Sequence, residues 1–122
     1  MSLVVVGSMA FDIIETPFGI TDKIVGGAAS YIALCSSYFS KDVKIVSVVG
    51  NDFPQEFTDK LTSRGINVEG VDIKKDQKSF FWRGRYHNDL NTRDTLVTEL
   101  NVLADFNPVL PETYKKCDFL QF

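Results

Sequence analysis

The sequence predicts an α/β fold with a doubly wound, mostly parallel sheet. Residues 3–6 and 43–49 are mainly apolar runs, which is typical of strands covered on both faces, and residues 68–73 are expected to form a third strand. Two segments with helical features, residues 28–40 and 52–65, lie between these runs. Strands that alternate with helices along a chain favour parallel pairing through helical crossovers.

Size and composition fit one domain over residues 1–122 and narrow the possible partners. The 122 residues are 44% hydrophobic and 24% charged, as in ordinary globular proteins. The net charge of −3 argues against a nucleic-acid partner, which usually needs a basic face. Cys35 and Cys117 fit no zinc spacing, and we interpret them as reduced thiols. Because no apolar stretch has membrane-spanning length and no basic region precedes the first apolar run, we expect no membrane partner and a cytoplasmic location.

The first expected strand, residues 3–6, ends close to a candidate ligand residue. Asp12 follows the carboxyl end of this strand, which is the edge where open α/β sheets bind ligands. Its carboxylate could accept hydrogen bonds from two hydroxyl groups, or it could be an ordinary turn or cap residue. Residues 13–19 are interpreted as a turn, and residues 21–25 as a short exposed strand.

A di-glycine, Gly26 and Gly27, stands directly before the expected helix at residues 28–40. Glycine lets other groups approach the backbone closely, and the first N–H groups of a helix favour oxygen-rich ligands. We therefore expect these glycines to contact a small molecule, although simple turn geometry is the alternative. For the second helix, Asp52 is expected as the N-cap and Gln55 as its capping-box partner, with Gly65 as the stop.

The region after the third strand departs from this alternation. Residues 79–87 and 93–100 are expected to form two strands of a hairpin, joined by a turn at residues 88–91. Inserted into an α/β domain, such a hairpin could act as a lid over a ligand. Residues 111–116 are expected as a short helix and residues 117–122 as a further buried strand, which suggests part of a larger fold.

Four features in order make the chain resemble the N-terminal part of ribokinase-like (PfkB) carbohydrate kinases: Gly7 to Asp12, the di-glycine, Gly50-Asn51-Asp52, and Gly65-Ile66-Asn67. The resemblance implies that the acceptor binds between an α/β domain and a β-sheet lid, here about residues 13–25 and 79–100. It also implies that Asp12 holds two sugar hydroxyls and that the sugar lies against the di-glycine backbone.

The chain departs from the family at three positions. Ala10 and Tyr31 stand where ribokinases carry asparagine, and Ala28 stands where ribokinase itself carries lysine. These changes argue against ribose as the acceptor. The family's catalytic aspartate and ATP pocket lie in its C-terminal half, and the sequence contains neither Gly-x-Gly-Asp nor a P-loop. ATP and Mg²⁺ are therefore expected to bind mainly outside residues 1–122, which alone are predicted to be inactive.

The sequence thus predicts an ATP-dependent carbohydrate kinase, with a nucleoside kinase or a non-catalytic sugar-binding module as alternatives. No catalytic or metal-binding residue is assigned within the chain. Aromatic residues such as Phe80 and Trp82 could stack on a ligand, or pack in a lid core or in a homodimer contact. Arginine and asparagine side chains of the hairpin could bind sugar oxygens or a sugar phosphate, or form a solvated face. The expected substrate-binding residues are Asp12, Gly26, Gly27, Arg83, Arg85 and Asn91.

Overall fold

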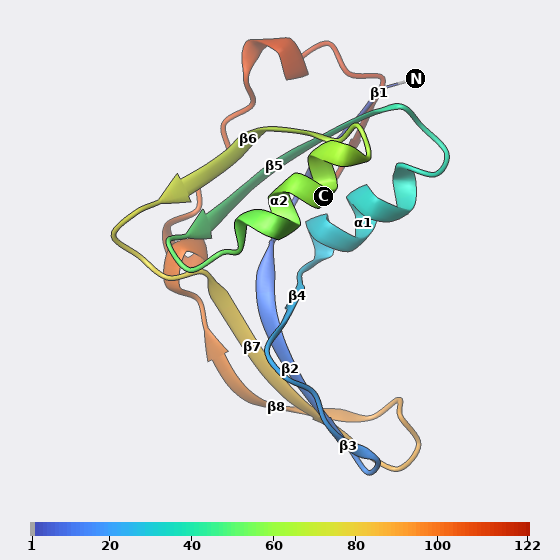
Figure 1. The fold of residues 1–122 in the computed structure, drawn as a ribbon, viewed down its shortest axis with the longest axis vertical. Helices are drawn as coiled ribbons and strands as arrows, with labels where there is room; N and C mark the ends of the chain where they lie inside the picture. Colours follow the sequence, from blue (N-terminus) through green and yellow to red (C-terminus); the bar gives the residue numbers. More distant parts are fainter. Residues whose placement is uncertain (1) are drawn as a thin grey trace.

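The computed structural model describes residues 2–122 and contains a four-stranded parallel sheet in the order β6-β5-β1-β9 (Figure 1). Its strands are β1 (Ser2–Val6), β5 (Asp42–Gly50), β6 (Asn67–Lys74) and β9 (Phe119–Gln121). The predicted α/β class and the three predicted parallel strands are confirmed. Within residues 2–122, no helix is long and apolar enough to cross a membrane.

Two helices, α1 (Ala28–Ser36) and α2 (Gln55–Ser63), cover the same face of this sheet (Figure 1). The chain moves in one direction from β1 to β5 to β6, and right-handed crossovers in one direction place both helices on one side. The core between helices and sheet consists of small and aliphatic side chains: Val5, Met9, Ala29, Ala33, Val43, Ile45, Val49, Leu61 and Ile66.

The other face of the sheet is covered by irregular chain. After β6 the chain returns to the far side of β1, and this return contains the 3₁₀ helices η1 (Asn101–Asp105) and η2 (Glu112–Tyr114). Tyr114 is fully buried against β1 and β5, and its hydroxyl donates to Asn67 Oδ1 at 2.7 Å. The reversal at β1 gives the doubly wound order, although no α-helix of residues 2–122 lies on this face.

Five further strands form a second, mixed sheet that extends away from the parallel sheet (Figure 1). They are β2 (Ala10–Thr16), β3 (Gly19–Ile20), β4 (Ile24–Gly26), β7 (Phe80–Tyr86) and β8 (Arg93–Glu99). The predicted hairpin is confirmed as the antiparallel pair β7 and β8.

Several boundaries differ from the predictions. Most of the turn expected at residues 13–19 belongs to β2, because β2 pairs with β7 over six residue pairs and only residues 17–18 turn. Helix α1 ends at Ser36 rather than at residue 40, since the chain tightens there and the Phe39 N–H donates to the Ser36 carbonyl at 2.9 Å. The strand at the C-terminal end is present but exposed, because β9 is the edge of its sheet.

The predicted N-cap at Asp52 is wrong, because Asp52 helps to join the two sheets. Pro54 occupies the N-cap position of α2, and the Gln55 side chain bonds Asp59 instead of forming a capping box. Asp52 Oδ1 accepts a hydrogen bond from the Ser79 N–H at 2.9 Å, and the Ser79 hydroxyl accepts one from the Gly50 N–H at 2.8 Å. Fully buried Ser79 thereby fixes the start of β7 against the end of β5.

Candidate functional site

A pocket of about 540 Å³ lies on one face of the mixed sheet, where that sheet meets the start of α1. We call it the Asp12 pocket. Side chains at alternate positions of a strand share one face, so Asp12 on β2 and Trp82 on β7 both point to this side. The remaining lining residues are Ala10, Ile14, Gly27, Ala28, Tyr31, Phe80, Tyr86 and Arg93.

Asp12 fits the pocket only because Gly26 lacks a side chain. β2 and β4 are paired antiparallel, and a Cβ atom placed on Gly26 would lie 2.0 Å from Asp12 Oδ2. The Tyr31 hydroxyl lies 3.4 Å from the same point. Within residues 2–122 the Asp12 carboxylate has no hydrogen-bond or ion-pair partner, and burial raises its pKa above the ordinary value. A half-buried carboxylate with free lone pairs is suited to accept hydrogen bonds from ligand hydroxyls.

Gly27 serves the start of α1. Its φ of +96° favours glycine, and a Cβ atom there would lie 2.5 Å from the Ser8 carbonyl oxygen. Ser8 also accepts hydrogen bonds from the first helical N–H groups: its carbonyl from Ala29 at 2.9 Å and its hydroxyl from Ala28 at 3.3 Å. These two N–H groups are therefore occupied by protein, a role of Ser8 that the sequence did not indicate.

Trp82 forms a flat wall of the pocket. A Cβ atom on Gly84 would lie 2.1 Å from the indole, so the ring lies directly over the Gly84 backbone. The indole Nε1 donates to Thr95 Oγ1 at 3.3 Å, and the Arg93 guanidinium carbon is 5.4 Å from the ring centroid. Trp82 was predicted only as an aromatic residue that could stack; the glycine two positions later was the sequence signal for its orientation.

The structure does not bring the predicted residues Arg83, Arg85 and Asn91 to the Asp12 pocket. Arg83 and Arg85 project from the opposite face of β7, where both bind the carboxylate of buried Glu15. Arg83 Nε donates to Glu15 Oε1 at 2.9 Å and Arg85 Nε to Oε2 at 3.0 Å. The hydrogen bonds from Arg83 and then Arg85 lower the pKa of Glu15. Asn91 lies in the β7–β8 turn, where its N–H donates to Asp89.

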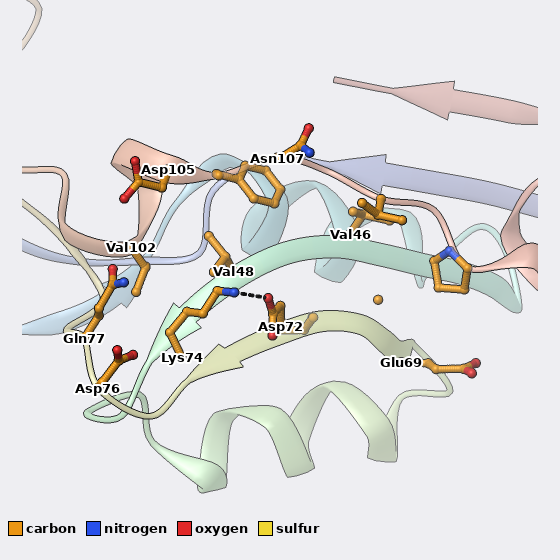
Figure 2. Close-up of a pocket in the computed structure, with 15 residues that line it drawn as sticks. Val46, Val48, Glu69, Asp72, Lys74, Asp76, Gln77, Val102, Asp105 and Asn107 are labelled. Atoms are coloured by element: carbon orange, nitrogen blue, oxygen red, sulfur yellow. Dashed lines mark ion pairs between the residues drawn. The ribbon is translucent and has the colours of Figure 1, made fainter.

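A separate cavity of about 580 Å³ lies on the face of the parallel sheet opposite the helices (Figure 2). Its walls combine apolar residues of β5 and η1, such as Val48 and Val102, with charged residues of β6. Lys74 Nζ and Asp72 Oδ2 form an ion pair there at 2.9 Å, drawn as a dashed line in Figure 2. Glu69, Asp76 and Asp105 also line this cavity, so its charged side chains are mainly acidic.

The described residues do not fit the metal or the phosphoryl donor that the resemblance implies. Among residues 2–122, no group of three or more His, Cys, Asp or Glu could hold a metal ion. Within the same residues, the helix start at Gly27 is bonded to Ser8 rather than open to phosphate oxygens.

Comparison with known proteins identifies proteins that share this fold. No family model matches the chain. A cytidine kinase of Thermococcus kodakarensis is 32% identical over 89 residues, which are 73% of this chain and 31% of that protein. A ribokinase from Cryptococcus neoformans var. grubii serotype A, solved in complex with ADP, superposes with a TM-score of 0.68 at 20% identity. The match covers 82% of this chain and 35% of the ribokinase chain.

A nucleoside kinase from Burkholderia thailandensis, solved in complex with inosine, superposes with a TM-score of 0.70 at 20% identity. The match covers 82% of this chain and 37% of that one. The chain thus spans about a third of the length of the relatives it matches. The chain has the ribokinase-like fold, and the resemblance to the ribokinase-like (PfkB) kinases is confirmed as a structural match to part of those proteins.

Proposed function

We propose that this chain carries the acceptor-binding part of an ATP-dependent kinase that phosphorylates a hydroxyl group of a sugar-containing small molecule. The observation that supports this most is Asp12, a half-buried carboxylate that has no partner within residues 2–122 and lines a pocket in the ribokinase-like fold. The names of the relatives support the reaction class, since they include a cytidine kinase and a ribokinase solved with ADP.

The geometry around Asp12 suits a vicinal diol. A carboxylate is an acceptor-only group whose two oxygens can each take a hydroxyl hydrogen, which fixes the orientation of a sugar ring. The missing side chain of Gly26 makes room for Oδ2 itself, and the Tyr31 hydroxyl approaches the same place from α1. In a kinase, holding the acceptor in one orientation accelerates attack of its free hydroxyl on the phosphoryl group.

The phosphoryl donor would be held mainly by residues outside this chain. The sequence contains no P-loop, and residues 2–122 form no metal cluster. We therefore expect residues 1–122 alone to show no ATP-dependent phosphorylation, and the complete protein to be active.

The mixed sheet is proposed to act as the lid, with segments at about residues 13–25 and 79–100. All seven residues of β8 are exposed, whereas β1 and β5 are largely buried, so the lid lies at the low-stability end of the fold. Hydrogen exchange of β7 and β8 is expected to be faster than that of β1 and β5, and to slow when acceptor binds. Equal protection with and without acceptor would reject the lid role.

An activity assay tests the proposed function. The complete protein is incubated with ATP and a panel of sugars and nucleosides, and ADP formation is measured. Acceptor-dependent turnover is expected for the parent and a loss of at least tenfold in kcat/KM for Asp12→Asn, since the charged hydroxyl contacts are removed. The matched control is Glu15→Gln, which changes a carboxylate of the same strand on the opposite face and should keep its activity. Acceptor binding without turnover would instead favour the non-catalytic sugar-binding module.

A further inference from the structure

We infer that Asp52 and Ser79 are positioning residues of the Asp12 pocket, because they fix the side chains that β7 contributes to it. The inference rests on the proposed function, since it takes this pocket as the acceptor site. One side of the pocket is the start of α1, and the other side is the mixed sheet. The width of the pocket therefore depends on how the mixed sheet is attached to the rest of the molecule.

Ser79 lies directly before β7 and binds three other segments through its N–H, its hydroxyl and its carbonyl. The N–H donates to Asp52 Oδ1 at 2.9 Å, and the hydroxyl accepts from the Gly50 N–H at 2.8 Å. The carbonyl accepts from Asn101 Nδ2 at 2.9 Å, just after the chain leaves β8. Because Ser79 is fully buried, water cannot replace these partners. Both ends of the hairpin are thus fixed to the end of β5 at one point, which we call the Ser79 joint.

The Ser79 joint is closely packed and charge-assisted. A Cβ atom on Gly50 would collide with the Ser79 nitrogen, so backbone lies against backbone there. Burial alone would raise the pKa of Asp52, but the hydrogen bonds from Ser79 and the positive charge of Lys23 outweigh it and lower the pKa. Asp52 is therefore ionised at neutral pH and holds the Ser79 N–H by a charge-assisted hydrogen bond.

The joint determines where two walls of the pocket stand relative to Asp12. Phe80 follows Ser79 directly, and Trp82 pairs with Asp12 in the register of β2 and β7; all three side chains line the pocket. Strand β2 starts from a separate point, where Ser8 accepts hydrogen bonds from the first N–H groups of α1. A shift at the start of β7 would therefore move Phe80 and Trp82, while the Ser8 contacts would still hold β2.

Tyr114 provides a buried hydrogen bond of the same kind on another part of the molecule. Its hydroxyl donates to Asn67 Oδ1 at 2.7 Å and accepts from the Gly70 N–H at 3.0 Å. Tyr114 is fully buried on the face of the parallel sheet opposite α1. Tyr114→Phe therefore removes buried hydrogen bonds and lowers stability without changing the Ser79 joint. A purely structural role of Asp52 would give Asp52→Ala and Tyr114→Phe the same effect.

Acceptor binding by matched variants tests the inference. The complete protein is titrated calorimetrically with cytidine, inosine and D-ribose, and the compound that the parent binds most tightly is used for the variants. Asp52→Ala should weaken its binding about tenfold, because the β7 walls are displaced. Asp52→Asn should lose only about twofold, because its amide oxygen can still accept the Ser79 N–H. Tyr114→Phe should melt at a lower temperature than the parent and keep the affinity of the parent.

Two results would overturn the inference and leave the proposed function standing, provided that Asp12→Asn loses binding. One is an affinity of Asp52→Ala equal to that of the parent. The other is an equal loss in Asp52→Asn and Asp52→Ala, because the charge of Asp52 rather than its bond to Ser79 would then matter.

A milder variant covers the case in which Asp52→Ala does not fold. Asn101→Gly removes only the bond to the Ser79 carbonyl, because glycine readily adopts the φ of +50° found there. Binding should then weaken about threefold, and unchanged binding would overturn the inference.

Quenching of Trp82 fluorescence by acrylamide tests the position of the wall without any acceptor. The Trp82 emission is taken as the difference between each protein and its Trp82→Phe counterpart. It should become more accessible to acrylamide in Asp52→Ala and stay as in the parent in Tyr114→Phe. If the parent binds none of the three compounds, the proposed function is contradicted, and this measurement alone decides the inference. Equal quenching in parent, Asp52→Ala and Tyr114→Phe would overturn it.

Discussion

Strand β2 carries two carboxylates whose surroundings are opposite. Asp12 and Glu15 are three positions apart, so they project from different faces of the mixed sheet. Glu15 is bound by Arg83 and Arg85, and these contacts lower its pKa. Asp12 has no protein partner within residues 2–122, and burial raises its pKa. A paired carboxylate stabilises the sheet by itself, whereas an unpaired, half-buried one opposes folding and is useful where a ligand supplies the missing donors.

The largest expected effect comes from removing the charge of Asp12. Asp12→Asn should weaken acceptor binding by about 2–3 kcal/mol, because charge-assisted hydrogen bonds to two hydroxyls are lost. Affinity for ATP should hardly change, since the proposed donor site lies elsewhere. Calorimetric titration of the complete protein with acceptor and with ATP measures both. An acceptor affinity within twofold of that of the parent would show that Asp12 does not bind the acceptor.

The second prediction displaces the Asp12 carboxylate without changing a charge. Gly26→Ala places a Cβ atom where Asp12 Oδ2 now lies, so the carboxylate or the β2–β4 pairing must shift. We expect acceptor binding to weaken about tenfold and stability to fall by about 1–3 kcal/mol, as for other overpacked sites. The matched control is Gly7→Ala, whose added Cβ would lie at an ordinary 3.5 Å from Ala29. Unchanged acceptor binding in Gly26→Ala would show that the position of the carboxylate is unimportant.

The third prediction concerns Glu15. Its pKa is lower in the folded protein than the ordinary value of 4.5, so its contribution to stability is complete above that value and is lost as pH falls through the folded pKa. Glu15→Gln should therefore unfold at lower temperature than the parent near neutral pH, and the difference should narrow below about pH 4.5. Thermal unfolding followed by circular dichroism across this range measures it. A difference that does not depend on pH would mean that packing, rather than the ion pairs, accounts for it.

The sequence was sufficient for the parallel sheet, because alternating strand and helix segments are local patterns. That Asp12 and Gly26 share a site was implied only by the family resemblance, and their contact depends on the pairing of β2 with β4. The sequence could not place Arg83 and Arg85, whose side of the sheet depends on the register between β2 and β7. Pro17 made residues 13–19 resemble a turn, which concealed Glu15 as the partner of the two arginines. A shift of one residue in the pairing register moves every side chain of a strand to the other face of the sheet. The register is set by the pairing of segments that are distant in the sequence.

The smallest expected effect tests the cost of leaving Asp12 unpaired. Because burial raises its pKa in the folded state, the folded protein binds a proton there more readily than the unfolded chain does. Ionised Asp12 therefore opposes folding above its raised pKa, and this cost disappears at low pH, where the group is protonated in both states. Asp12→Asn, which keeps the shape without the charge, should be slightly more stable than the parent at neutral pH and equal to it in acid.

Thermal unfolding of the two proteins without acceptor measures this difference, with Glu15→Gln as the comparison that should change in the opposite direction. Lowering the pH through the raised pKa of Asp12 should also weaken acceptor binding by the parent, because the protonated carboxyl group carries no charge. If Asp12→Asn is instead less stable than the parent at neutral pH, the carboxylate stabilises the fold as Glu15 does. The contrast between the two faces of β2 would then not distinguish a ligand group from a structural one.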